Sequence, residues 1–351
     1  MDEPTVSIFI RNRDEAVALQ HAIASLRKQK IDGTMEIVVL DNESTDDSPQ
    51  IAAEGSARVF TLPRELFGYG RALNLGVELC RGEIVVLLSS HSIPQNEHWL
   101  AELIRPIQEN DSVGAAFCHQ IPPTRVSTLE KQRFACFPGQ SQILDRDRFL
   151  ALCEEGADPY EVAVFSNSAC AVRRKDALAQ PFRDLLYAED RAFAVDLVMT
   201  GRSVAFVRQA VVSYERSMTW KSAYAVGYRA QVSKCLIREL AATYSGIRYG
   251  MGRERISRLL RAGGVILTLL LRLALSLGEP RGLKRRSALY AYRATGATLG
   301  LAKGVLYWRR HVETLSCDGL QLQEARRRCT PYVPRTHEAV DRSGIAGRTD
   351  G

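Results

Sequence analysis

Polar residues that could bind a ligand follow an apolar run early in the chain. Asp41 ends the run that begins at Ile37, and Asn42 and Ser44 come directly after it. A carboxylate in this place could accept hydrogen bonds from a nucleobase or from a ribose hydroxyl. Strings of Asp, Asn and Ser are equally typical of an Asx turn that caps a helix. The local pattern therefore leaves a binding role and a turn role open for Asp41.

Two further groups of residues could take part in catalysis. His91 follows a second apolar run, among serines, where an imidazole could ligate a metal or donate to a phosphate. Glu189 and Asp190 open a helical segment, and adjacent carboxylates can supply a general base. The simpler interpretations are a plain loop residue for His91 and a favourable helix dipole for the two acids. Taken alone, neither group decides a function.

A strand, a helix and a second strand precede the first polar cluster. The strands are predicted at 5–10 and 37–40, and the helix between them has an apolar face formed by Val17, Ile23 and Leu26. Strand, helix and strand at this spacing form a βαβ unit, and βαβ units build parallel sheets. The N-terminus is therefore predicted to be α/β.

The same alternation continues to the cluster around His91. Its elements are predicted in this order: a helix at about 45–54, a strand at 57–62, a helix at 70–80 and a strand at 82–90. The first 95 residues or so should therefore form an open, doubly wound sheet. Ligands of such sheets bind beyond the carboxyl ends of the strands, and Asp41 and His91 both fall there.

The rest of the chain divides into a mixed middle and a helical end. Strands are predicted at 113–120, 168–174 and 203–214, with a loop that leads into a helix over 185–201. From residue 220 onward the pattern is helical, and the last residues lack apolar content. We therefore predict an α/β domain at 1–219, a basic helical region at 220–335 and a disordered tail at 336–351.

The composition excludes several classes of protein. Hydrophobic residues make up 46% and charged residues 25% of the 351, which excludes collagen-like, low-complexity and multi-pass membrane chains. No run of eighteen apolar residues predicts a spanning helix. The acidic start does not resemble a signal peptide, and the eight scattered cysteines form no CxxC pairs. We therefore expect a cytoplasmic chain with reduced thiols.

The positive charge is concentrated near the C-terminus. Residues 246–336 hold 18 Lys/Arg and 5 Asp/Glu, a net charge of +13 in a chain of +7, so the remainder is acidic. Within this region, 262–278 is strongly apolar and is interrupted by Arg272. Such a segment suits the headgroup layer of an anionic membrane. The alternative is an ordinary core helix, whereas nucleic acid is not expected as a partner because no recognition motif accompanies the charge.

Four separated motifs together resemble glycosyltransferase family 2. They are RNRDEA, LDNESTDDS, FGYGRALNLGVELCRGEIVVLLSSHSIP and YAEDRAF, in this order, within residues 4–235. The resemblance implies a GT-A fold, with a doubly wound mixed sheet and here a helical C-terminal extension. It also implies inverting transfer of a sugar from a nucleotide-diphosphate donor. Bacterial enzymes of surface polysaccharide synthesis, rhamnosyltransferase-like members among them, are the most similar.

The resemblance also assigns residues to the nucleotide-sugar site. It implies that the backbone near Ile10 and Arg11 and the side chain of Asp41 bind the base and ribose. It places further residues beside the nucleotide or its phosphates: Arg13 and Ser44 in the same two loops, Arg71 and Asn74 in the next helix, and Ser90 and His91 at the end of the strand predicted at 82–90. His91 and Arg71 would then neutralise the leaving diphosphate.

The metal-binding motif of the family is altered here. Its Asp-x-Asp aligns with Ser89-Ser90-His91, and Tyr214 stands where many members have a late histidine. Hard cations such as Mg²⁺ and Mn²⁺ prefer carboxylate ligands, and both carboxylates of the motif are missing here. The resemblance implies a divalent metal, and the sequence leaves only His91 of this motif to ligate it.

The resemblance implies that Asp190, with Glu189 beside it, deprotonates the acceptor hydroxyl. Asn167 would line the sugar or acceptor pocket, or else belong to a turn. The expected acceptor is a saccharide or a lipid-linked saccharide. The enzyme is expected to be a peripheral protein on the inner face of the plasma membrane. The alternative is a non-catalytic nucleotide-binding module of the same fold or a membrane-docked assembly factor. Donor, acceptor, linkage and oligomeric state are not specified by these motifs.

Overall fold

The chain is represented by a computed structural model that describes residues 4–122, 134, 136–185, 187–215, 220–246 and 319–334. The strands β1, β2 and β3 and the helices α1 and α2 alternate at the N-terminus, and β4 follows. Their bounds are β1 Val6–Asn12, α1 Ala16–Leu26, β2 Met35–Asp41, α2 Ser48–Glu54, β3 Arg58–Thr61 and β4 Ile84–Ser89. The predicted βαβ pattern is confirmed, because β1 pairs in parallel with both β2 and β4, and β2 pairs in parallel with β3.

The apolar face of α1 differs in one residue from the predicted face. Val17 is 68% exposed, whereas Leu19, Ala22, Ile23 and Leu26 are buried. Residues three, four and seven positions apart share one side of a helix, so Leu19 lies in line with Ile23 and Leu26, and Val17 lies on the outer side. The assignment of Val17 to the core was therefore wrong.

The middle of the chain extends the same sheet with antiparallel pairs. Among the described residues the strand order is β10-β3-β2-β1-β4-β8-β6-β9-β5, and β7 pairs with β9. The added strands are β5 Ser92–Pro94, β6 Val113–Ile121, β7 Gln142–Leu144, β8 Ala169–Arg173 and β9 Ser203–Tyr214. Since β8 is antiparallel to β4 and β6 while β9 is parallel to β6, the sheet is mixed, as predicted.

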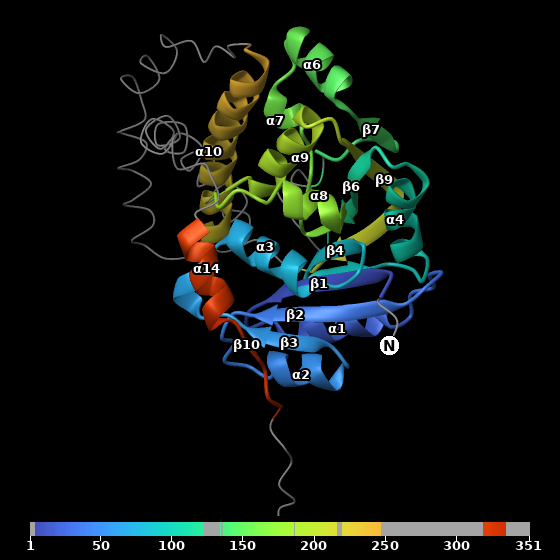
Figure 1. The fold of residues 1–351 in the computed structure, drawn as a ribbon, viewed down its shortest axis with the longest axis vertical. Helices are drawn as coiled ribbons and strands as arrows, with labels where there is room; N and C mark the ends of the chain where they lie inside the picture. Colours follow the sequence, from blue (N-terminus) through green and yellow to red (C-terminus); the bar gives the residue numbers. More distant parts are fainter. Residues whose placement is uncertain are drawn as a thin grey trace, which may run out of the picture.

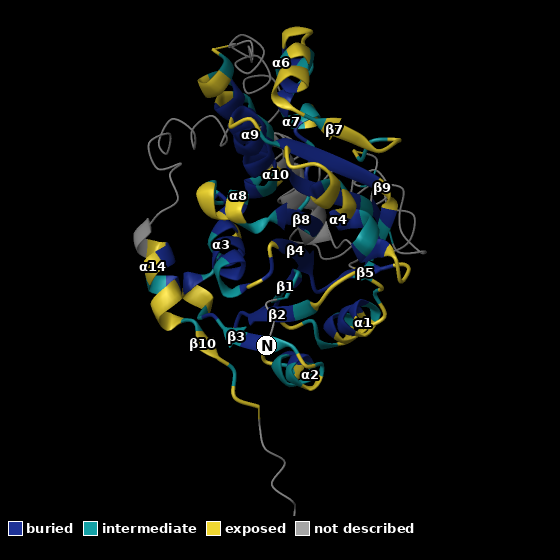
Figure 2. Ribbon diagram, turned by 45° about the vertical axis from the view of Figure 1, so that its right-hand side comes forward, coloured by how far each residue is buried: buried dark blue, intermediate teal, exposed yellow. Residues whose placement is uncertain are grey.

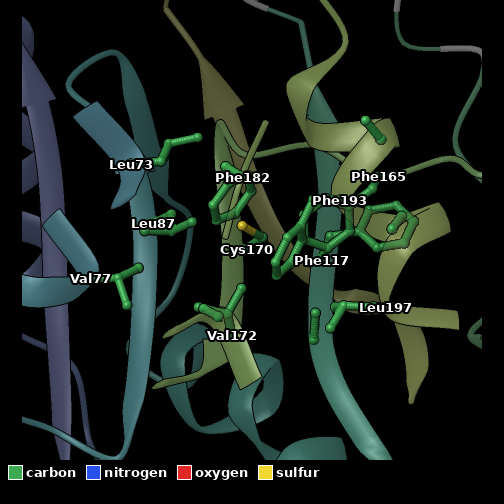
Figure 3. Packing of buried hydrophobic residues seen from close by; sticks show 14 of the residues in the cluster. Leu73, Val77, Leu87, Phe117, Phe165, Cys170, Val172, Phe182, Phe193 and Leu197 are labelled. Atoms are coloured by element: carbon green, nitrogen blue, oxygen red, sulfur yellow. The ribbon is translucent and has the colours of Figure 1, made fainter. Parts of the chain in front are cut away.

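Helices cover both faces of this sheet (Figure 1). The remaining elements of the first 215 residues are η1 Arg64–Leu66, α3 Tyr69–Leu79, α4 Trp99–Glu109, α6 Arg146–Glu154, α7 Pro159–Val162, α8 Arg174–Ala179 and α9 Glu189–Met199. One core packs under α1, α2 and α4, and the other under α3, α8 and α9. In Figure 3 the rings of Phe117, Phe165, Phe182 and Phe193 gather near Cys170 in the second core. Figure 2 shows buried strands between helices with exposed outer faces.

Two C-terminal segments belong to the same folded unit as the sheet. The helix α10 (Trp220–Ser245) buries Ile237, Leu240 and Ala241 in the second core. The helix α14 (Gly319–Arg328) packs on α3, and β10 (Thr330–Pro331) pairs antiparallel with β3 (Figure 1). These elements lie within the region predicted at 220–335, and they bury apolar side chains against the α/β core.

The apolar stretch 262–278 and the tail predicted at 336–351 lie outside the described residues. Over the part of the chain that the structure covers, no helix combines the length and apolar character needed to cross a bilayer. The seven cysteines in that part are free thiols.

Candidate active site

Two adjoining cavities open where the strands β1, β2 and β4 end. The larger has a volume of about 380 Å³ and the smaller about 290 Å³. Their walls share Arg11, Tyr69, Ser89 and His91. The parallel strands bring their carboxyl ends to one edge of the sheet, so residues 80 positions apart in sequence meet there.

The smaller cavity is built from the loops that follow β1 and β2. Its walls include Asn12, Arg13, Asn42 and Ser90. Asp14 and Glu43 in the same loops have φ angles of 51° and 50°, a left-handed conformation that non-glycine residues rarely adopt. Such strain concentrates at functional sites, where the surrounding structure holds the backbone in place.

Asp41 and Ser44 hold these two loops together. One carboxylate oxygen of Asp41 accepts from Asn12 Nδ2 at 3.0 Å and from Ser44 Oγ at 2.5 Å, and the other accepts from the Ser44 amide at 2.8 Å. Neither residue lines either of these two cavities, and the hydrogen bonds of Asp41 are those of a residue that stabilises a turn. The side chain of Ile10 is buried in the core, which leaves only its backbone for ligand contact.

Arg71 and Asn74 of α3 are directed at the segment before α9. Arg71 Nε lies 2.7 Å from a carboxylate oxygen of Asp184, and the Asn74 amide exchanges two hydrogen bonds of 2.8 Å with the backbone of Phe182. Neither residue lines either cavity. Both therefore fix the position of this segment, which leads directly to the acidic pair.

Glu189 and Asp190 lie at the N-terminus of α9 and line the larger cavity. Ala188 before them has a φ of 62°, so this turn is also left-handed. Asn167 Nδ2 donates to a Glu189 oxygen at 2.8 Å, and an Arg11 nitrogen donates to Asn167 Oδ1 at 3.1 Å. Arg11, Asn167 and Glu189, from three distant parts of the chain, thus form one hydrogen-bonded row. Asn167 lines the larger cavity.

The environment of the acidic pair raises the pKa of both carboxyl groups. Burial, together with the neighbouring Asp190, raises the pKa of Glu189 to about 7, against the opposing influence of Arg11. Burial also raises the pKa of Asp190, while Arg191 opposes the change. Raised pKa values in two adjacent carboxyl groups that line a cavity are a property of general acid–base sites.

The opposite wall of the larger cavity carries arginines stacked on tyrosine rings. Arg191 lies 3.9 Å from the centroid of the Tyr160 ring, and Arg229 of α10 lies 5.0 Å from that of Tyr187. Among the described residues, no carboxylate lies within ion-pair distance of either guanidinium. These four residues could not be identified from the sequence, because stacking between α7, α9 and α10 leaves no local sequence pattern.

His91 lies between the two cavities and contacts Tyr214. Their ring centroids are 4.4 Å apart, because Tyr214 ends β9 and pairs with Ser92 of β5. A carboxylate oxygen of Glu15 lies 3.4 Å from His91 Nδ1. The structure thus brings together the residues that align with the family's metal-binding positions.

These residues do not fit a divalent metal. Ser89, Ser90 and Tyr214 offer only hydroxyl groups, and Glu15 is the one carboxylate in the wall of the smaller cavity. In the part of the chain that the structure describes, no three His, Cys, Asp or Glu side chains are grouped so as to hold a metal ion. Mg²⁺ and Mn²⁺ prefer carboxylate ligands, so His91 is not supported as a metal ligand.

Comparisons with known proteins agree on one family. The family model for "Glycosyl transferase family 2" matches residues 6–177. The O-antigen chain rhamnosyltransferase WbaN of Salmonella anatum is 24% identical over 189 residues, which cover 52% of this chain and 58% of that protein. The chain thus matches little more than half the length of this relative.

Solved structures share the fold at low sequence identity. The mannosyltransferase PcManGT from Pyrobaculum calidifontis, solved with GDP-Man and Mn²⁺, is 18% identical with a TM-score of 0.52, and the match covers 87% of each chain. TarS of S. aureus is 14% identical with a TM-score of 0.50, over 85% of this chain and 55% of TarS. The predicted GT-A fold is confirmed, and residues 6–177 are similar in sequence to glycosyltransferase family 2.

Proposed function

We propose that this enzyme transfers a sugar from a nucleotide-diphosphate donor to an acceptor hydroxyl with inversion at the anomeric carbon. The observation that carries the proposal is the row Arg11–Asn167–Glu189, which joins a cation to the acidic pair across the two cavities. The nucleotide occupies the smaller cavity, and the sugar and acceptor meet in the larger. The diphosphate then lies at the shared wall, beside Arg11 and His91.

The acidic pair supplies the base of the reaction. Asp190 takes the proton of the acceptor hydroxyl as its oxygen attacks the anomeric carbon, and the bond from that carbon to the diphosphate oxygen breaks. The nucleoside diphosphate leaves with the bonding electrons. Glu189 carries the proton that the pair retains at neutral pH, which keeps Asp190 ionised for the next acceptor.

The acceptor proposed is a phosphate-linked saccharide of a bacterial surface polysaccharide. Arg191 and Arg229 place two positive charges without described carboxylate partners at the acceptor side of the larger cavity, where a phosphate would pair with them. The tyrosine rings beneath them offer flat apolar surface for a sugar ring. The name of the Salmonella relative, an O-antigen chain rhamnosyltransferase, supports this class of product.

The basic segment near the C-terminus would bring the enzyme to a lipid-linked acceptor. Residues 246–336 carry a net charge of +13 around the apolar stretch 262–278, a composition that favours an anionic membrane surface. Accordingly, we propose a peripheral position on the cytoplasmic face of the plasma membrane. Support for this step comes from composition alone.

Release of nucleoside diphosphate from a panel of UDP-, dTDP- and GDP-sugars tests the function. Wild-type protein should turn over at least one donor in the presence of a lipid-extract acceptor, and Asp190→Asn should lower the rate by about 10²–10⁴-fold. The variant should still bind the nucleoside diphosphate. Nucleotide binding without turnover of any donor would favour the non-catalytic binding module instead.

A further inference from the structure

The residues that align with a metal site in this family do not form one here, so another charge must stand beside the leaving diphosphate. We propose that Arg11, assisted by the imidazole of His91, takes the place of the divalent cation, and that transfer proceeds without a bound metal. The inference rests on the proposed function, because it concerns the leaving group of the same reaction.

The sheet register places Arg11 next to the altered motif. Arg11 of β1 pairs with Ser89 of β4, and Ser89 is the first of the three residues that align with Asp-x-Asp. Paired residues of neighbouring strands point to the same side of a sheet, and both residues line both cavities. A guanidinium is permanently charged, so it repels a cation where the family would bind one and attracts a phosphate instead.

Both groups have hydrogen-bonding capacity left for a ligand. Arg11 donates through one terminal nitrogen to Asn167, while its other terminal nitrogen is buried and has no hydrogen-bond partner among the described residues. His91 Nδ1 is likewise buried without a hydrogen bond, although Glu15 lies within ion-pair distance of it. A buried donor without a partner is costly, and an anion between the cavities would satisfy the free nitrogen of Arg11.

The late histidine position is closed to a metal by the same packing. The Tyr214 ring lies edge-on against His91 and so occupies the side of the imidazole that faces β9. A phenol is a poor ligand for Mg²⁺ or Mn²⁺ at neutral pH. Ser89, His91 and Tyr214 stand where the family has two carboxylates and a histidine. All three metal ligands are therefore replaced together, while the cation Arg11 lies beside them.

Direct titration with Mn²⁺ tests the proposal without any knowledge of the sugar. The probe is Mn²⁺ itself, followed by electron paramagnetic resonance and calorimetry, with wild-type protein saturated with UDP, dTDP or GDP. Apart from the Mn²⁺ that free nucleotide binds, wild-type protein should show no Mn²⁺ site with a Kd below about 1 mM. The triple variant S89D/H91D/Y214H should gain a site at least tenfold tighter. A tight wild-type site that is lost in Glu15→Gln would overturn the proposal.

A second measurement addresses Arg11 and does not depend on folding of the triple variant. Arg11→Ala should weaken nucleoside diphosphate binding by about 10- to 100-fold, and the monophosphate by much less, since a charged hydrogen bond to the outer phosphate is lost. Arg11→Lys should restore part of the loss. The matched control is Arg27→Ala at the C-cap of α1, because Arg27 lines neither cavity. Equal losses for mono- and diphosphate would contradict the assignment.

The two proposals fail in different ways. Donor turnover that EDTA abolishes and Mn²⁺ restores would refute metal-free transfer and leave the glycosyltransferase function standing. If no donor in the panel were turned over, the proposed function would fail, while the Mn²⁺ titration would still report on the charge beside the diphosphate.

Discussion

Removing the charge of Glu189 should stabilise the protein at alkaline pH. Burial and the neighbouring Asp190 raise the pKa of this carboxyl from 4.5 to about 7, so the folded protein holds its proton more tightly than the unfolded chain. Stability is then lost as pH rises from 4.5 through 7, because the buried group must ionise. At about 1.36 kcal/mol per pKa unit, the ionised residue costs about 3 kcal/mol at pH 8.

The variant Glu189→Gln has nearly the same shape and lacks the charge. Its amide oxygen can still accept from Asn167 Nδ2, which donates to Glu189 at 2.8 Å. The free energy of unfolding, measured with urea, should exceed that of wild type by about 3 kcal/mol at pH 8. The difference should shrink to about 0.4 kcal/mol at pH 4.5, where half of the unfolded chains carry the charge.

A matched substitution separates this effect from the general effect of a lost charge. Glu83 precedes β4 and is exposed, so Glu83→Gln should change stability by less than about 0.5 kcal/mol at either pH. If Glu189→Gln were no more stable than wild type at pH 8, or if its advantage did not fall with pH, the raised pKa of the buried acid would be refuted.

Three other perturbations test the loops, the C-terminal elements and the basic region. Asp41→Ala should destabilise the fold by about 1–3 kcal/mol in a denaturant titration, since it removes the acceptor of hydrogen bonds from Asn12 Nδ2 and from the Ser44 backbone amide; an unchanged midpoint would contradict the turn role. Ala325→Asp, which buries a charge under α14, should cost roughly 3–5 kcal/mol, whereas the exposed neighbour Gln323→Asp should not. The full chain should sediment with anionic vesicles, less so at high salt, and equal behaviour toward neutral vesicles would refute the membrane proposal.

Periodicity was sufficient to predict the parallel half of the fold. The strands β1, β2 and β4 are continuous apolar runs, and such runs separated by helices have few alternatives to a parallel sheet. The acidic pair was also predictable, because Glu189 and Asp190 are the first two residues of a helix whose remaining residues are mostly apolar. These features are local, so the sequence reports them directly.

Features that depend on distant contacts could not be predicted in the same way. Asp41, Arg71 and Asn74 are polar residues near the cavities, and only the coordinates reveal that they bind other parts of the chain instead of lining a pocket. The attachment of α14 depends on ion pairs such as Arg326 with Glu78, which are 248 residues apart. A charge pattern cannot distinguish such pairs from a solvated surface.

A crystal structure of the chain with a bound nucleoside diphosphate and excess Mn²⁺ would decide whether Arg11 takes the place of a metal. We expect the base and ribose in the smaller cavity and the diphosphate within hydrogen-bond distance of Arg11 and His91. The outer phosphate should face the cavity that Glu189 and Asp190 line, and no Mn²⁺ should lie beside Ser89. A diphosphate held by Mn²⁺, or a nucleotide outside these two cavities, would contradict the account.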